Sequence, residues 1–258
     1  MAAFFIMKIS IPQNIFARLL VNSLPAFERF EVEPTQSAMI VQAVEKGESE
    51  LGIIPAFDLL QHSELFVSNK IGISFDGPLS NSYLYFKPSQ RNIDKLFLTG
   101  DVSTNEIILS KIILLEKFGV NISPQLTAEI KEFDKENYLV VGNENFQDML
   151  LEKGVSFSEI IAEYIDYPYV NFVLVSKNKM LLEEISNFEK KVDETIEDNL
   201  AEYLSGLDLS QNAKNFITEN FDSVYFEITG NEITGLSELL RLAYYHGIVK
   251  EITEINLT

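Results

Sequence analysis

Segments typical of buried strands alternate with segments typical of amphipathic helices through the first two thirds of the chain. Residues 4–11 form a short apolar run, and residues 12–20 carry apolar side chains at helical spacing. A second apolar run, residues 50–55, follows a helical segment that Gly47 ends. Strands that alternate with crossover helices form a sheet covered by helices, so the sequence predicts an α/β fold.

The last third of the chain has a helical pattern. Helices are predicted over residues 179–204, 211–221 and 234–249, with Asp and Glu falling between apolar positions at helical spacing. That spacing is typical of a solvated helix face. With 258 residues, of which 46% are hydrophobic, the chain can form one large domain or two small lobes.

The chain is strongly acidic, because 20 Lys and Arg stand against 39 Asp and Glu to give a formal net charge of −19. A surface of this sign repels nucleic-acid phosphates and anionic lipid headgroups, so neither is expected as a partner. The apolar residues 1–7 precede the first cation, Lys8, which is the reverse of a secretory signal. No segment reaches the roughly 20 apolar residues that span a bilayer. We therefore expect a soluble, cytoplasmic protein.

Cysteine is absent, and histidine is limited to His62 and His246. This composition excludes disulfides, thiolate nucleophiles and cysteine-based zinc sites. It also leaves little material for a His-led metal site or a Ser-His-Asp triad. We therefore expect no metal site, and we interpret His62 as a surface residue.

Small polar residues in loops are the remaining candidates for a site. They gather at residues 22–23, 74–82 and 103–105, and each group has an ordinary structural alternative as a helix stop, a turn or a helix N-cap. Residues 103–105 follow a predicted strand and open a helix, and residues 138–146 repeat this arrangement. Unpaired backbone N–H groups at such a point can receive an anion.

Two acidic residues are candidates for a general base. Asp58 lies in a helical turn after the strand at residues 50–55, and Asp101 lies in the loop after the strand at residues 96–99. No spacing rule connects the two carboxylates, so the sequence does not decide between a catalytic and a structural role.

Several segments resemble, in order, segments of the menaquinone-biosynthesis family that includes chorismate dehydratase of the futalosine pathway. Residues 21–25 are similar to that family's Tyr-Leu-Asn-Thr-x-Pro segment, and residues 43–60 to its L-x-x-G-E-x-D-x-x-x-I-P-S-x-E-Y stretch. Residues 72–84, GISFDGPLSNSYL, resemble its Ile-Ser-Ser-x-Gly-Pro-Val-x-Ser-Val turn and strand. Further likenesses lie at residues 98–107, 138–146 and 235–248.

The resemblance implies a two-lobed fold similar to type 2 periplasmic solute-binding proteins, with a central cleft and a helical C-terminal region. Candidate hinges near residues 87 and 176 then divide the chain in two. Lobe 1 comprises residues 1–87 plus 176–258, and lobe 2 comprises residues 88–175. Closure of the lobes would exclude water from a bound small anion.

The family removes water from chorismate without a metal or organic cofactor, so the resemblance implies a lyase with a small carboxylate substrate. It implies that Asn22, Ser80 and Ser82 form the reacting centre. The residues that it implies for substrate binding are Ser23, Ser74, Phe75, Ser103, Thr104 and Asn143. Phe75 and Asn143 stand where the family usually has Ser and Asp.

Two other functions fit the same sequence. A non-catalytic or divergent binding protein for small anions would keep the cleft without turnover. An acidic protein-interaction module would use its surface charge to bind a basic partner. The order of the family-like segments favours the dehydratase type, while substrate and oligomeric state stay open.

Overall fold

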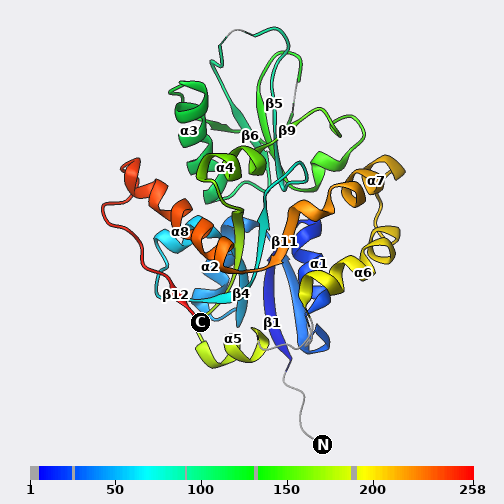
Figure 1. Ribbon diagram of the computed structural model, residues 1–258, viewed down its shortest axis with the longest axis vertical. Helices are drawn as coiled ribbons and strands as arrows, with labels where there is room; N and C mark the ends of the chain where they lie inside the picture. Colours follow the sequence, from blue (N-terminus) through cyan, green and yellow to red (C-terminus); the bar gives the residue numbers. More distant parts are fainter. Residues whose placement is uncertain (1–5, 25–26, 91, 131–132, 187–190) are drawn as a thin grey trace, which may run out of the picture.

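The computed structural model describes residues 6–258 except 25–26, 91, 131–132 and 187–190. Two β-sheets, each with its own helices, form two lobes that lie one above the other in Figure 1. The chain crosses from the lower lobe to the upper one and returns, so the first strand, β1, and the last, β12, both belong to the lower lobe.

The larger sheet has the strand order β11-β4-β10-β3-β1-β2, with β12 paired to β4. Its strands are β1 (Met7–Pro12), β2 (Phe30–Thr35), β3 (Leu51–Pro55), β4 (Phe66–Phe75), β10 (Tyr169–Ser176), β11 (Val224–Glu227) and β12 (Asn256–Leu257). β1 is parallel to β2 and β3, whereas β10 is antiparallel to β3 and β4. Every residue of β10 is buried, because this strand lies in the middle of the sheet with helices on both faces.

The smaller sheet has the strand order β7-β6-β8-β5-β9. Its strands are β5 (Ser82–Tyr85), β6 (Phe97–Gly100), β7 (Gln125–Leu126), β8 (Tyr138–Val141) and β9 (Val155–Ser156). β6 is parallel to β7 and β8, whereas β5 is antiparallel to β8 and β9. The carboxyl ends of β6 and β8 therefore lie side by side at one edge.

Strand membership places the two crossings earlier in the chain than the predicted hinges. β5 was assigned to lobe 1 by the predicted hinge near residue 87, but it pairs with β8 because Tyr83 and Tyr85 pack with Tyr138 in the core of the smaller sheet. β10, predicted mostly in lobe 2, belongs to the larger sheet. The chain thus leaves the larger sheet after Phe75 and returns to it at Tyr169.

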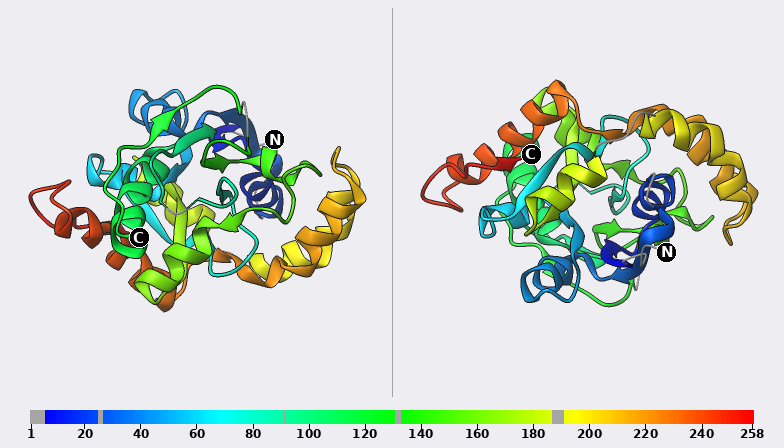
Figure 2. Two further views of the ribbon diagram at one scale, coloured as in Figure 1. Left: turned by 90° about the horizontal axis from the view of Figure 1, so that it is seen from above. Right: turned by 90° about the horizontal axis from the view of Figure 1, so that it is seen from below.

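Helices cover both faces of the larger sheet (Figures 1 and 2). The helices of both lobes are α1 (Ile15–Ser23), α2 (Ser37–Lys46), α3 (Thr104–Phe118), α4 (Phe157–Ile165), α5 (Lys179–Ser186), α6 (Val192–Ser205), α7 (Gln211–Glu219) and α8 (Gly230–Tyr245), of which α3 and α4 lie in the upper lobe of Figure 1. Short 3-10 turns are η1 (Phe27–Arg29), η2 (Ala56–Leu60), η3 (Asn143–Phe146) and η4 (Phe221–Ser223). One core joins the sheet to α1, α5, α6 and α7, and the other joins it to α2 and α8 and continues into α3 and α4.

Capping residues explain where the helices begin and end. The predicted helix over residues 12–20 starts later, because the Asn14 side chain accepts a 2.8 Å hydrogen bond from Ala17 N and caps α1. α3 begins with a capping box of Ser103 and Glu106 and ends at Gly119, whose φ is 65°.

Two predicted elements extend past the described residues. The first strand begins at Met7, and the predicted residues 4–5 lie outside the described part. The predicted helix over residues 179–204 corresponds to α5 and α6, with residues 187–190 also outside it. Within the described residues, no helix is both long and apolar enough to cross a membrane.

Candidate functional site

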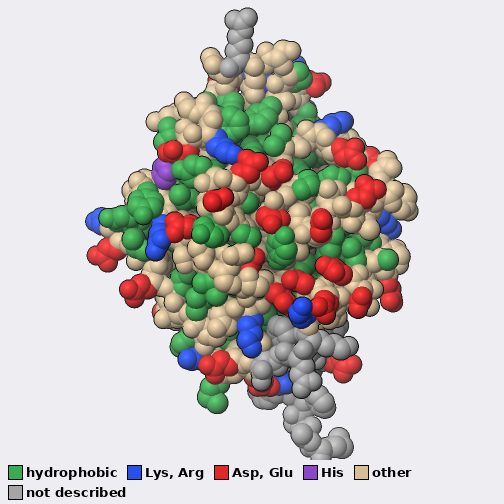
Figure 3. Space-filling model, in the orientation of Figure 1, with side chains coloured by type: hydrophobic (Ala, Val, Ile, Leu, Met, Phe, Trp, Pro, Cys, Tyr) green, Lys and Arg blue, Asp and Glu red, His purple; other side chains and the backbone are tan. Residues whose placement is uncertain are grey.

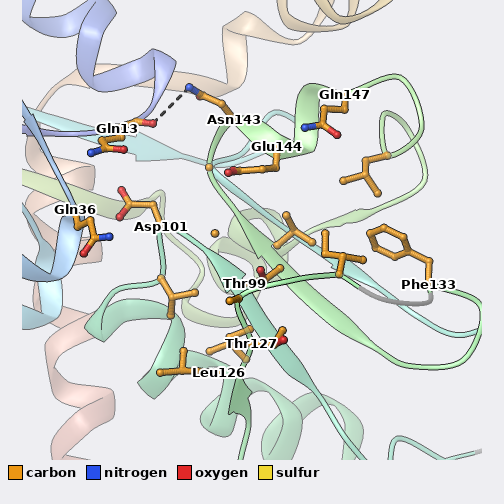
Figure 4. A pocket seen from close by; sticks show the side chains of 18 of the residues that line it. Gln13, Gln36, Thr99, Asp101, Leu126, Thr127, Phe133, Asn143, Glu144 and Gln147 are labelled. Atoms are coloured by element: carbon orange, nitrogen blue, oxygen red, sulfur yellow. Dashed lines mark hydrogen bonds between the residues drawn. The ribbon is translucent and has the colours of Figure 1, made fainter.

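A cavity of about 1170 Å³ lies between the two sheets, and both lobes contribute to its lining (Figure 4). The larger-sheet lobe contributes Gln13, after β1, and Gln36 and Ala38, at the start of α2. The smaller-sheet lobe contributes the ends of β6 and β8, the residues after β7, and η3. Ligand sites of α/β folds commonly lie at the carboxyl ends of strands, where this cavity lies.

Asp101, which follows β6, holds the N-terminus of α2 across the cavity. Its two carboxylate oxygens accept hydrogen bonds from Ser37 N at 2.8 Å and from Ser37 Oγ at 2.7 Å. The N-cap residue of α2, Gln36, makes no side-chain cap. Asp101 therefore supplies the cap from the opposite lobe, where the helix dipole favours a negative charge.

Asn143 at the start of η3 makes the equivalent contact with α1. Its Oδ1 accepts a hydrogen bond from Ile15 N at 3.0 Å, and its Nδ2 donates to Gln13 O at 3.4 Å. Asn143 was implied as a substrate-binding residue, and the structure places it on the cavity wall in contact with the other lobe. Two helix N-termini of one lobe are thus held by side chains of the other.

A third contact between the lobes joins η2 to the start of α3. The Thr104 hydroxyl donates to Asp58 Oδ1, and Phe57 N donates to Asn105 Oδ1 at 2.9 Å. Asp58 is 7% exposed, and its Oδ2 has no partner among the described residues. Burial raises the pKa of Asp58 to about 6, although the hydrogen bond from Thr104 opposes this shift.

Ser80 and Ser82, implied as part of the reacting centre, are fully buried, with Ser80 in the crossing between β4 and β5 and Ser82 at the start of β5. Ser80 Oγ donates to Ser82 O at 2.8 Å and lies 2.7 Å from Ser158 Oγ. Neither serine lines the cavity among the described residues. Ser80 therefore shapes the crossing by joining it to α4.

Ser74 and Phe75 at the end of β4 are also fully buried. The Phe75 ring packs edge-on against Phe16 with 5.0 Å between ring centroids, so it belongs to the core on the α1 side. The hydroxyls of Ser74 and Ser82 have no hydrogen-bond partner among the described residues. The crossing thus contains polar groups that the protein leaves unpaired.

The remaining implied residues lie at helix ends. Ser103 accepts a hydrogen bond from Asn105 N and donates to Glu106 at 2.6 Å, which is an N-cap role. Asn22 and Ser23 are in the last turn of α1, and Asn22 is exposed, because the helix continues past the predicted stop. The structure therefore does not bring Asn22 to Ser80 and Ser82 in one cavity.

Several cavity residues were missed by reasoning from the sequence. Gln13 and Thr99 lie at strand ends, so the rule that ligand residues follow parallel strands could have identified them. Gly100 has a φ of +91°, and a Cβ there would lie 1.9 Å from Val141 O. Only glycine allows β6 and β8 to approach this closely at the back of the cavity.

One group of side chains within the described part of the chain could hold a metal ion, and it lies outside the cavity lining. Glu45, His62 and Glu64 have potential ligand atoms within 4.8 Å of one another. His62 Nδ1 lies 2.7 Å from Glu45 Oε1, so a histidine–carboxylate hydrogen bond already accounts for the closest pair.

Solved structures with this architecture match nearly the whole chain. The alkanesulfonate-binding protein SsuA from Xanthomonas axonopodis pv. citri, bound to MOPS, is 11% identical, with a TM-score of 0.62 and coverage of 98% of this chain and 97% of that one. The ligand-binding component of an ABC-type import system from Staphylococcus aureus, with zinc bound, is 13% identical, with a TM-score of 0.61 and coverage of 94% and 92%. The CA3427 gene product of Candida albicans, which exhibits the generic periplasmic binding protein fold, is 13% identical, with a TM-score of 0.52 and coverage of 95% and 91%.

The fold is that of the periplasmic binding proteins. The predicted two-lobed α/β fold is thereby confirmed, and identities this low show the fold alone. No protein-family model matches the chain, and no curated protein matches its sequence. Membership of the chorismate dehydratase family stays a prediction.

Proposed function

We propose that the protein binds a small molecule between its two lobes. The observation that carries this proposal is the cavity of about 1170 Å³, which both lobes line and which residues at strand ends and helix starts surround. Its volume is somewhat above the usual range for small-molecule sites, which is about 300–1,000 Å³. The periplasmic binding protein fold supports the same function, since the matched SsuA structure contains a bound small molecule.

To admit a ligand, the two lobes would move apart as rigid bodies. We place lobe 1 on the larger sheet and lobe 2 on the smaller sheet, with crossings after Phe75 and before Tyr169. The contacts of Asp101 with Ser37 and of Asn143 with Ile15 then hold the lobes closed. Opening requires these hydrogen bonds, the η2–α3 contacts and the hydrogen bond from Ser210 to Asp148 to break. It also requires the core that continues from the larger sheet into α3 and α4 to separate, as in a hinge motion between lobes.

Blocking the cavity from an exposed position tests the proposal. Ala38 is exposed at the start of α2 and lines the cavity, whereas its neighbour Met39 is exposed and does not line it. We expect thermal-shift screening of a metabolite library to find ligands of the wild type, and Ala38→Trp to weaken them at least about tenfold in calorimetry.

Met39→Trp serves as the matched control and should bind like the wild type. Ligand binding that survives equally in both tryptophan variants would place the site elsewhere. A library that stabilises none of the three proteins would remove the support for a small-molecule function.

Dehydration of chorismate is the second candidate, favoured by the buried and unpartnered hydroxyls of Ser74 and Ser82. A substrate could supply the missing hydrogen bonds only after the lobes open, because both serines are fully buried and lie outside the cavity lining. Incubation with chorismate and ultraviolet detection of an aromatic product tests this candidate. Product that Ser82→Ala abolishes supports it, whereas chorismate left unchanged at high protein concentration rejects it.

The third alternative, an acidic interaction module, would concentrate its charge where a basic partner binds. On the face of the molecule that Figure 3 shows, Asp and Glu are instead spread out, with basic and apolar side chains among them. A cytoplasmic location, predicted from composition, is tested by fractionating cells that express the native gene.

A further inference from the structure

All charged side chains that line the cavity within the described residues are acidic, namely Asp101, Asp134 and Glu144. Two of them, Asp101 and Glu144, lie close to Gly142. If this glycine carried a Cβ, that atom would lie 3.1 Å from Glu144 Oε2 and 3.9 Å from Asp101 Cβ. The Asp101 oxygens accept hydrogen bonds from Ser37, but the Glu144 carboxylate has no partner in the described part of the chain. A positive charge in this space would lower the electrostatic energy of both carboxylates.

A hydroxyl on the cavity wall, from a residue that is itself buried, points independently to a ligand. Thr99 lines the cavity, is only 6% exposed, and its hydroxyl makes no hydrogen bond with the described residues. Figure 4 shows Thr99 between Glu144 on one side and Leu126 and Thr127 on the other. A ligand that carries N–H groups would satisfy this hydroxyl as well as the carboxylates.

An aromatic side chain completes the lining. The Phe133 ring packs edge-on against the rings of Tyr85 and Tyr138, each at 5.3 Å between centroids. It lines the cavity together with the apolar side chains of Leu126 and Ile130. Aromatic rings and carboxylates together are the usual surroundings of bound ammonium groups.

We propose that this cavity takes an organic cation, an ammonium compound that carries an apolar or aromatic group. The proposal rests on the proposed function, because it names the ligand class of the same cavity. A carboxylate ligand would bring a further negative charge beside Asp101 and Glu144, which the lining opposes. A bare metal ion is disfavoured there, since the group that could hold one within the described residues lies at Glu45, His62 and Glu64.

Probes matched in shape but not in charge test the ligand class. Phenethylammonium, 2-phenylethanol and 3-phenylpropionate share one aromatic arm, and spermidine and choline extend the cation set. We expect at least one cation to bind in calorimetry at least about tenfold more tightly than 3-phenylpropionate. Glu144→Gln should weaken that cation about tenfold, whereas Glu219→Gln, on the exposed face of α7, removes the same charge and should leave binding unchanged.

The possible outcomes separate this inference from the proposed function. Binding of 3-phenylpropionate or 2-phenylethanol in preference to every cation, lost in Ala38→Trp, overturns the cation class and keeps the small-molecule function. Cation binding that Glu144→Gln and Glu219→Gln weaken equally, or that Ca²⁺ reproduces, shows only general attraction to an acidic protein and also overturns the inference. Failure of all five probes at about 1 mM overturns the cation class, while the library screen still decides the function.

Discussion

The Asp101 carboxylate bridges the two lobes by accepting hydrogen bonds from both the backbone N–H and the hydroxyl of Ser37, at 2.8 and 2.7 Å. An acidic side chain of one lobe thus occupies the helix N-terminus of the other, which is the position that an anionic ligand would otherwise take. The closed arrangement is therefore stabilised by the protein's own carboxylate.

Removal of this carboxylate should open the lobes. We expect Asp101→Ala to lower the free energy of unfolding by about 1 kcal/mol, as for loss of a helix cap, and to increase the radius of gyration in small-angle X-ray scattering. Asp198→Ala removes an exposed acid of α6 and should change neither quantity. An unchanged radius of gyration in Asp101→Ala would show that the other contacts suffice for closure.

The two asparagines of the α1 region should behave differently. Asn14 caps α1 and is 4% exposed, so Asn14→Ala should cost about 1 kcal/mol of stability. Asn22 is exposed in the last turn of α1, so Asn22→Ala should stay within about 0.5 kcal/mol of the wild type. Thermal denaturation of both variants measures the difference. A loss of ligand binding in Asn22→Ala alone would restore that residue to the site.

Stability should depend on pH through Asp58. Burial raises its folded pKa to about 6 from an ordinary value of 3.8, so the folded state holds the proton more tightly than the unfolded state. The resulting stabilisation is present below pH 3.8 and is lost as the pH rises through about 6. The full loss is on the order of 3 kcal/mol, given the size of this shift.

Asp58→Asn removes this titration and should flatten the fall in stability between about pH 4 and 6 in denaturant titrations. Asp193 has a pKa raised to about 6, with burial as the largest cause, and accepts a hydrogen bond from Phe226 N. Asp193→Asn should therefore also reduce the fall of the free energy of unfolding with pH, independently of Asp58→Asn. A slope that Asp58→Asn leaves unchanged would assign the whole effect to Asp193 and other acids.

Glycine at position 100 should be essential for the back of the cavity. A Cβ there would lie 1.9 Å from Val141 O, and its φ of +91° already disfavours other residues. We expect Gly100→Ala to destabilise the protein by about 3 kcal/mol or more. Gly119→Ala is the control, because its φ of +65° is similar but no atom lies within 4 Å, and it should cost about 1 kcal/mol. Equal losses of melting temperature would show that backbone conformation, not the contact with Val141, sets the requirement.

The sequence predicts the fold class well, because each lobe follows local rules. The apolar run at residues 50–55 corresponds to the fully buried β3, and the Ser103 cap and Gly119 stop bound α3. The predicted hinges lie later in the chain than the points where the strands change sheet, since local alternation in β5 does not show which sheet it joins. That choice depends on contacts with Tyr138, which lies far away in the sequence.

The site was harder to predict for a related reason. Helical spacing continues through residues 12–20 and predicts Gln13 and Asn14 within a helix, although they form the loop after β1. The likeness to a family motif indicates Asn22 instead, which lies at the far end of α1. Asp101 was identified as a candidate, but its partner Ser37 in the other lobe could not be read from either local segment.

The central position of β10 has a consequence for how the chain folds. Val173 of β10 pairs with Ile54 of β3, and the entire smaller sheet lies between them in the sequence. The larger sheet therefore cannot be completed until that intervening segment has been synthesised and its ends brought together, which is a high-contact-order step. We expect residues 82–165 to collapse first during synthesis. Until β10 is added, the N-terminal strands have an open sheet edge that chaperones can bind.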